Sequence, residues 1–179
     1  MRLAVIFLST VYHRLRHITN IRVKFKGWQN LSFSTMISVN NKGSICFGKR
    51  IMARRNAVFT ADKGSIIIGD YTTFNYNCIT VSHGEIKIGK YCSIGPNVVI
   101  YDHDHLFDKT GYRGNEYKTG FVEIEDNCWI GANVTILRNA HIGEGSVIGA
   151  GTVVKGDIPP HSLVTLDREI KIRPIENRH

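Results

Sequence analysis

One short repeat constrains this chain more than any other feature of its sequence. From Ile124 the chain reads IEDNCW IGANVT ILRNAH IGEGSV IGAGTV VKGDIP, and each block opens with an aliphatic residue. The second residue is Gly in three of these blocks, and the fifth is small or compact. The same spacing returns from Ile68 and from Ile88, and more faintly from Phe47. A fixed short period of this kind indicates a repeat architecture.

The period also predicts the shape of each repeat. Six residues suffice for a short strand and a corner, so three blocks would close a triangular coil of about eighteen residues. Successive coils would stack as parallel strands roughly 4.8 Å apart. The aliphatic residues would point inward as ladders, and Gly in second position would avoid a Cβ clash at the corner. The 17 glycines and 4 prolines among 179 residues agree with one domain of many tight corners.

The repeat is interrupted between Ile100 and Val122, where the chain reads YDHDHLFDKTGYRGNEYKTGF. The register resumes in phase at Ile124, thirty-six residues after Ile88. An excursion that keeps the phase predicts a loop extruded from one corner of an intact prism, and inserted loops often carry function. Its histidines suit proton transfer near neutral pH. Asp102 or Asp104 could orient such an imidazole.

The sequence before the repeat predicts a helix. Apolar residues recur there at spacings of three and four, namely Leu3, Phe7, Val11, Leu15 and Ile18. The apolar run of about ten residues is too short to span a bilayer, and no small-residue cleavage site follows it. Two interpretations remain open: a helix packed against the body of the protein, or a basic amphipathic helix on an anionic membrane surface through residues 1–18.

We therefore expect three segments. Residues 1–30 form a helical, amphipathic segment, residues 31–165 form the β-helix domain with a loop at 101–121, and residues 166–179 form a tail. The expected location is cytoplasmic, and association with the inner face of the membrane is left open.

Charge and cysteine content narrow the partners. The net charge of +8 favours anionic partners such as a phosphorylated cofactor, an acidic glycan or a lipid headgroup. Nucleic acid is not expected, because the basic residues are scattered and only GKRIMARRNA forms a cluster. None of the four cysteines forms a C-x-x-C pair, so we expect reduced, buried thiols that serve as small hydrophobic side chains.

With these motifs the chain resembles the hexapeptide-repeat acyltransferases, whose fold is a left-handed parallel β-helix. The hand is taken from the resemblance, because the usual crossover preference is right-handed. The segments IYDHDHLFD and NCWIGANVTI look like those of galactoside and maltose O-acetyltransferases and of related enzymes of polysaccharide biosynthesis. The resemblance implies direct transfer of the acetyl group of acetyl-CoA to a sugar or surface-polysaccharide hydroxyl, without an acyl-enzyme or a metal. It also implies a homotrimer with its sites between subunits.

The same resemblance assigns roles to individual residues. It implies His105 as general base with His103 in reserve, supported by Asp102, and it implies acceptor contacts from Asn75 and His103. The coenzyme A contacts that it implies are Trp129, Gly131, Ala132, Gly149, Ala150, Lys155 and Arg173. The glycines have a competing explanation, because every coil needs a glycine corner. The tail VTLDREIKIRPIE departs from the family pattern. The choice between an acetyl group and a longer acyl group as the group transferred is therefore left open.

Two other functions fit the repeat. A zinc enzyme like the γ-class carbonic anhydrases would need three histidine ligands, for which His83, His103 and His105 are available, although their spacing does not match that family. A non-catalytic β-helical binding protein would have no need for a polar, histidine-bearing loop at one corner.

Overall fold

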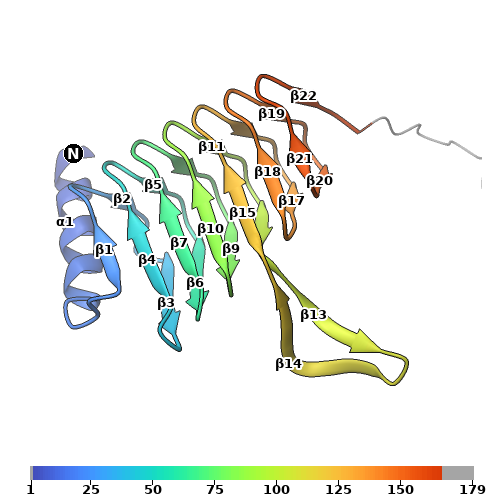
Figure 1. The fold of residues 1–179 in the computed structure, drawn as a ribbon. Helices are drawn as coiled ribbons and strands as arrows, with labels where there is room; N and C mark the ends of the chain where they lie inside the picture. The colour runs from blue at the N-terminus through green and yellow to red at the C-terminus, as the bar shows by residue number, and fades with distance from the viewer. Residues whose placement is uncertain (1, 167–179) are drawn as a thin grey trace, which may run out of the picture.

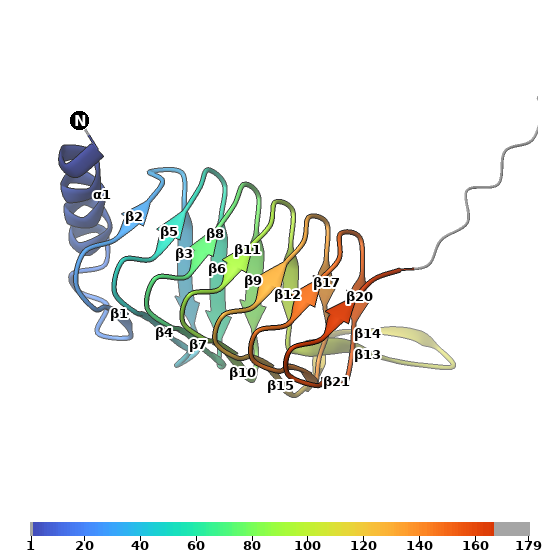
Figure 2. The same cartoon turned by 90° about the horizontal axis from the view of Figure 1, so that it is seen from above.

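The computed structural model describes residues 2–166, which form a parallel β-helix closed at its first end by one α-helix (Figures 1 and 2). The chain winds through three parallel sheets, which make three faces of a prism. Face 1 contains β1 (Val23–Phe25), β4 (Ser44–Phe47), β7 (Ser65–Ile68), β10 (Glu85–Ile88), β15 (Phe121–Ile124), β18 (Ala140–Ile142) and β21 (Asp157–Ile158). The expectation of a parallel β-helix with a short N-terminal helix is thus confirmed.

The other two faces follow in the same order along the axis. Face 2 contains β2 (Asn30–Leu31), β5 (Met52–Ala53), β8 (Thr73–Phe74), β11 (Ser93–Ile94), β16 (Trp129–Ile130), β19 (Val147–Ile148) and β22 (Leu163–Val164). Face 3 contains β3 (Met36–Asn40), β6 (Val58–Asp62), β9 (Ile79–Ser82), β12 (Val99–Tyr101), β17 (Thr135–Ile136) and β20 (Val153–Val154). We call the edges between them corner 1–2, corner 2–3 and corner 3–1.

The core consists of the inward ladders that the repeat predicts. On face 1, Ile68, Ile88, Ile124 and Ile142 pair in register from coil to coil, and all four side chains are buried. Strands such as β7 and β10 alternate a buried aliphatic residue with a residue that points outward, as the two-residue period of a strand requires. Burial of aliphatic side chains contributes about 1.5–3 kcal/mol each, so the ladders are the main source of stability.

Corner 2–3 is built from asparagines in a left-handed backbone conformation. Asn56, Asn77, Asn97 and Asn133 have φ values of 63°, 59°, 57° and 57°. Each side-chain amide donates to the next carbonyl oxygen along the row, at 3.1, 3.1 and 3.0 Å. Asparagine tolerates this conformation better than other residues with a Cβ, so the recurring Asn of the repeat is a corner residue.

The coils are not uniformly eighteen residues long. Ile124 pairs with Ile142, eighteen positions later, but Ile68 pairs with Ile88, twenty positions later. The longer coils contain a turn at corner 3–1, formed by 62–64 in one coil and by 82–84 in the next. Ile88 pairs directly with Ile124. The thirty-six residues between them therefore form one coil with an insertion, rather than two regular coils.

The insertion is a β-hairpin. Strand β13 (His103–Asp108) pairs antiparallel with β14 (Gly111–Thr119), with an irregularity between His105 and Phe107. The hairpin projects from corner 3–1 (Figure 1). The predicted extrusion is confirmed, but the polar composition of the segment did not predict paired strands.

Helix α1 (Arg2–Arg16) lies across the open end of the first coil (Figure 2). Its buried side chains are polar: Ser9, Thr10 and His13. Ser9 Oγ donates to the Leu31 carbonyl, and His13 Nε2 lies 3.0 Å from the Ser32 carbonyl. The helix therefore packs against the body, as one interpretation expected, but through polar groups rather than through the apolar stripe. No helix within residues 2–166 is long and apolar enough to cross a bilayer.

The cysteines are free, and three of them are buried in the core. Burial raises the pKa of the Cys78 thiol to about 11, whereas the hydrogen bond with Cys128, followed by burial, raises the pKa of the Cys92 thiol. A thiol with a raised pKa is a weak nucleophile, so Cys78 and Cys92 serve as small hydrophobic groups.

Candidate functional site

The root of the hairpin holds a fully buried carboxylate. Asp102 is 0% exposed and lies between β12 and the first strand of the hairpin, β13. Its Oδ2 accepts from Ser82 Oγ at 2.6 Å and from the Gly84 N–H at 2.9 Å, and its Oδ1 accepts from the His83 N–H at 2.8 Å. Burial alone would raise the pKa of Asp102, but the hydrogen bonds hold it below its ordinary value. Asp102 is therefore a fixed carboxylate, charged at neutral pH.

Asp102 holds one of the histidines that the sequence singled out. Asp102 Oδ1 lies 3.1 Å from His103 Nδ1. With Nδ1–H donating to the carboxylate, the other ring nitrogen, Nε2, has a free lone pair. The His103 side chain is 9% exposed, so its environment is largely protein. A carboxylate that fixes the tautomer of an imidazole is the arrangement of a general base.

Aromatic rings surround His103. The His83 ring meets it edge-on, with centroids 4.2 Å apart, and Tyr117 of β14 lies edge-on at 5.2 Å. Tyr117 in turn stacks on His83 at 4.2 Å. Burial is the largest cause that lowers the pKa of His83, followed by the nearby His103. A neutral His83 leaves His103 without a competing positive charge.

His105 lies farther out on the same strand and is exposed. Its ring centroid is 6.4 Å from that of His103 and 4.7 Å from that of Tyr117. Between the two histidines, Asp104 accepts a hydrogen bond from Arg138 Nε at 2.7 Å. This ion pair joins the hairpin to corner 3–1 of the following coil, so it fixes how the hairpin leaves the prism. Of the sequence-predicted residues, Asp102, His103 and His105 are thus brought together.

The other predicted residues lie elsewhere on the prism. Trp129 stands on face 2 with 58% of its surface exposed, between Ser93 and Val147 of the neighbouring coils. Asn75 lies at corner 2–3, where its Oδ1 accepts from the Tyr76 N–H at 2.9 Å. The histidines belong to corner 3–1, so a single chain does not bring the two groups together.

Corner 2–3 also holds the predicted cofactor glycines and alanines. A Cβ on Gly131 would lie 2.7 Å from the Ala150 nitrogen, so close stacking of the coils already accounts for this glycine. The N–H groups of Gly131 and Gly149 donate within the ladder, to Ile148 and Val164. Among backbone oxygens of residues 2–166, none accepts from the N–H of Ala132 or Ala150. The alanines, rather than the glycines, can thus offer donors to a ligand.

Two cationic residues complete the set of predictions. Lys155 is exposed at corner 3–1, between β20 and β21, on the same edge of the prism as the hairpin. Arg173 lies outside the described residues. In the part of the chain that the structure describes, no three His, Cys, Asp or Glu side chains are grouped to hold a metal ion.

Sequence reasoning missed the contributions of Ser82, His83 and Tyr117. His83 was considered only as a metal ligand, yet it occupies the turn at corner 3–1 one coil before the hairpin. The signal was available, because Ser82 and Gly84 occupy the same positions in their turn as Asp102 and Gly120 do one coil later. Tyr117 gave no signal, since only the pairing of β13 with β14 places it beside His105.

Comparisons with known proteins agree with the repeat. Residues 121–156 match the family model described as bacterial transferase hexapeptide, six repeats. A Schizosaccharomyces pombe protein that is provisionally named an acetyltransferase is 44% identical over 104 residues, which cover 58% of this chain and 50% of that protein. The chain spans only about half to 60% of the length of such curated relatives.

Two solved structures are also similar. One is a hexapeptide-repeat acetyltransferase of Vibrio cholerae in complex with acetyl-CoA, 31% identical, with a TM-score of 0.54 over 70% of this chain and 64% of that one. The other is a maltose O-acetyltransferase of Clostridium difficile, 29% identical, with a TM-score of 0.55 over 85% of this chain and 70% of that one.

Proposed function

Since this chain carries the hexapeptide repeat of the bacterial transferases, we propose that it is an O-acetyltransferase that moves the acetyl group of acetyl-CoA to a sugar hydroxyl. The single observation that carries the proposal is the buried Asp102–His103 pair at the root of the hairpin. The similarity to a maltose O-acetyltransferase supports a carbohydrate acceptor. Within this class of acceptor, a surface-polysaccharide intermediate is an alternative that is larger than a free sugar.

The geometry favours His103 as the base. Asp102 holds Nδ1, so Nε2 takes the proton from the acceptor hydroxyl as its oxygen becomes the nucleophile. His103 then returns this proton to the sulfur of the departing coenzyme A. The imidazole is thereby neutral again for the next turnover. Asp102 keeps its charge throughout and stabilises the imidazolium. His105, which the resemblance favours, lies close enough to contact the same acceptor.

Acetyl-CoA supplies the acetyl group as a thioester. The residues that would hold it are Trp129, with its exposed indole, and the N–H groups of Ala132 and Ala150. A flat apolar surface beside unpaired donors fits a ligand that has both an extended chain and polar amide groups. Lys155 would meet a phosphate from corner 3–1.

A second copy of the chain would complete the site. The histidines lie at corner 3–1, whereas Trp129 and Ala132 lie on face 2 and corner 2–3. A ring of three prisms would bring corner 3–1 of one subunit against face 2 of the next, which gives three equivalent sites.

The test begins with calorimetric titration of acetyl-CoA, which needs no knowledge of the acceptor. We expect saturable binding near one per chain, weakened in Trp129→Ala and unchanged in His103→Ala. Transfer is then measured over a panel of sugars as release of coenzyme A. His103→Ala should lower kcat roughly 10²–10⁴-fold. Full activity in that variant, with loss in His105→Ala, would assign the base to His105 instead.

Mixed subunits test the shared site. His103→Ala and Trp129→Ala chains, each less active than wild type, should regain part of the activity when they are unfolded together and refolded as mixed rings. Some interfaces then combine an intact histidine with an intact tryptophan. Activity that stays absent in the mixture, while wild type regains its own after the same treatment, would contradict a site between subunits.

A further inference from the structure

Helix α1 buries a polar side and exposes an apolar side. The buried side is polar, with Ser9, Thr10 and His13 hydrogen-bonded or packed against the first coil. The outward side carries Val5, Leu8, Tyr12 and Leu15 at spacings of three and four residues, all exposed. A helix of a globular protein normally buries its apolar stripe. Here the stripe is exposed, and the polar side of the helix faces the first coil.

The exposed apolar surface continues beyond the helix. Ile18 and Ile21, in the segment after α1, are 73% and 84% exposed, and Trp28 is 54% exposed beside Phe7, with ring centroids 5.5 Å apart. We call the surface formed by α1 and these residues the cap face. An apolar surface of this extent at one end of a molecule marks an interaction site.

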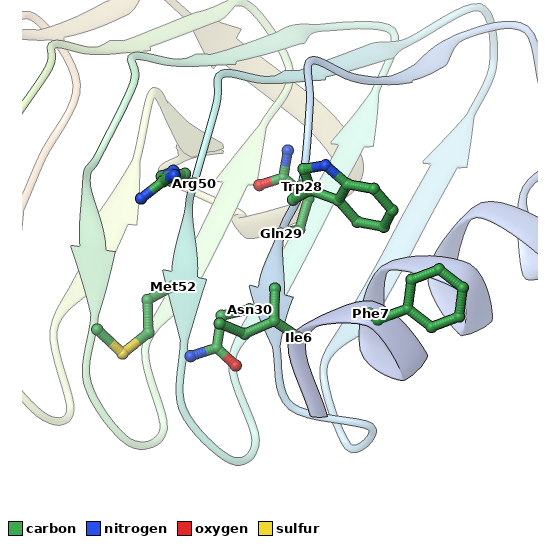
Figure 3. Close-up of a pocket in the computed structure, with 7 residues that line it drawn as sticks. All are labelled: Ile6, Phe7, Trp28, Gln29, Asn30, Arg50 and Met52. Atoms are coloured by element: carbon green, nitrogen blue, oxygen red, sulfur yellow. The ribbon is translucent and has the colours of Figure 1, made fainter. Parts of the chain in front are cut away.

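A hollow of about 600 Å³ opens beside the cap face, between α1 and face 2 (Figure 3). Ile6, Phe7 and Trp28 lie on the helix side, and Met52 and Arg50 come from the next coil. Its lining is thus mainly apolar, with a guanidinium among the lining groups. That combination suits an acyl chain whose headgroup carries a negative charge.

The charge of the N-terminal third identifies the partner. Residues 1–61 contain 11 of the 23 Lys and Arg residues and none of the 15 Asp and Glu residues. The remaining 118 residues hold 12 basic and 15 acidic residues, so the positive charge of the molecule belongs to the end that carries the cap face. Two copies of such a surface would repel each other, which disfavours a second chain as its partner. Arginine and lysine around exposed Trp, Phe and Leu are typical of helices that lie in the interface of an anionic membrane.

We propose that the cap face docks the protein onto the surface of an anionic lipid bilayer, with α1 lying in the headgroup region. This inference is independent of acyl transfer, since none of the residues that carry it belongs to the histidine cluster or to face 2 beyond Met52. In this arrangement the axis of the prism points away from the membrane. The hairpin leaves the prism three coils beyond the first coil, which α1 covers.

The experiment uses the full chain and vesicle co-sedimentation. One set of vesicles contains phosphatidylcholine alone, and another also contains phosphatidylglycerol. We expect binding to the anionic vesicles only, and weaker binding as salt is added, because exposed charges are screened. Leu8→Gln with Leu15→Gln should weaken binding at least about tenfold, since two inserted apolar side chains are lost. Both leucines are more than half exposed and glutamine is a good helix former, so the fold should be retained.

Matched controls separate this surface from general charge and hydrophobicity. Leu163→Gln removes a leucine that is more exposed than either of those two leucines, from β22 at the opposite end, and this variant should bind as wild type does. Arg16→Glu with Arg22→Glu should abolish anionic binding, whereas the same charge change on the hairpin, Lys109→Glu with Lys118→Glu, should not. Equal binding to neutral vesicles, no binding to either kind, or loss in the controls as well would overturn the proposal. A fall in molecular mass of the leucine variant without vesicles would assign the face to a second copy, which also overturns it.

Discussion

At the scale of single residues, Asp102 shows how the fold prepares a base. The backbone N–H groups and the hydroxyl that hold its carboxylate come from the turn of the previous coil, Ser82 to Gly84. The carboxylate is therefore fixed by the stacking of coils and not by the hairpin itself. His103 therefore receives its orientation, through Asp102, from the turn of the previous coil.

Asp102→Asn should separate orientation from binding. The amide cannot satisfy all of the donors and His103 Nδ1 together, so we expect kcat to fall roughly 10²–10⁴-fold with little change in the Kd of acetyl-CoA. Stability should fall by about 1–3 kcal/mol, because a buried donor loses its partner. Steady-state kinetics, calorimetry and denaturant unfolding measure the three quantities. Asp157→Asn, at an exposed carboxylate on β21, serves as the comparison, and an equal loss of kcat there would contradict the role given to Asp102.

His13 makes the capped end sensitive to acid. Burial is the largest cause that lowers the pKa of His13 below 6.5, so the native state favours the neutral ring. The unfolded chain then binds the proton more readily, and stability that is present above pH 6.5 is lost as the pH falls below it. We expect the melting temperature to fall between about pH 7 and about pH 5, and to fall less in His13→Gln, which keeps a donor for the Ser32 carbonyl. Circular dichroism melts measure both, and identical pH profiles would contradict the assignment.

At the scale of elements, the asparagine row of corner 2–3 combines two demands in one residue type. The corner needs positive φ, and adjacent coils gain a hydrogen bond between side-chain amides. These two contributions can be separated at Asn97. Asn97→Gly keeps the conformation and loses the hydrogen bonds, whereas Asn97→Ala loses both.

We therefore expect Asn97→Ala to destabilise the protein by about 1–2 kcal/mol more than Asn97→Gly, because alanine must adopt a left-handed conformation. Chemical denaturation of both variants gives the difference. If the two variants are equally stable, the amide row and not the backbone conformation determines the residue at this corner. The prediction concerns stability only, since the Asn97 side chain is exposed and touches no histidine.

The elements also show what the sequence could predict. The ladders and corners follow from the repeat, because one residue type recurs wherever one backbone environment recurs. The strands of the hairpin could not be predicted, since β13 and β14 hold polar residues on both sides and pair only with each other. The orientation of α1 could not be predicted either. Ser9 and His13 are buried because they bond the carbonyl groups of Leu31 and Ser32, and the local sequence pattern of the helix gives no sign of these bonds. Asn75 at corner 2–3 and Trp129 on face 2 lie away from the histidines of the same chain, so the roles that the resemblance implies for them stay predictions.

At the scale of the whole molecule, the hairpin is an addition to a prism that is complete without it. The Gly120 N–H donates to the Asp102 carbonyl at 2.8 Å, so the two ends of the insertion meet as an ordinary turn. The equivalent turn one coil earlier is Ser82-His83-Gly84. Replacing residues 103–119 by a single lysine would give a turn of that length.

We expect this shortened chain to fold with a melting temperature within a few degrees of wild type, and to have no transferase activity. The reason is that the hairpin contributes little to the core, yet it supplies His103 and His105. Circular dichroism and the coenzyme A release assay measure the two results. Retained activity would remove both histidines from the mechanism, and failure to fold would show that the hairpin stabilises the prism.

The helix at the first coil has one more consequence, for assembly. A parallel solenoid ends in a strand edge whose N–H and C=O groups could template another molecule. In this protein, Ser9, Thr10 and His13 occupy the carbonyls of residues 29, 31 and 32, so a polar side of α1 stands where a further coil would add. Without α1, that edge would be an open growth point, and molecules could join end to end into filaments. The inverted helix thus covers this edge with hydroxyl and imidazole groups, which can bond the open carbonyls as leucine side chains could not.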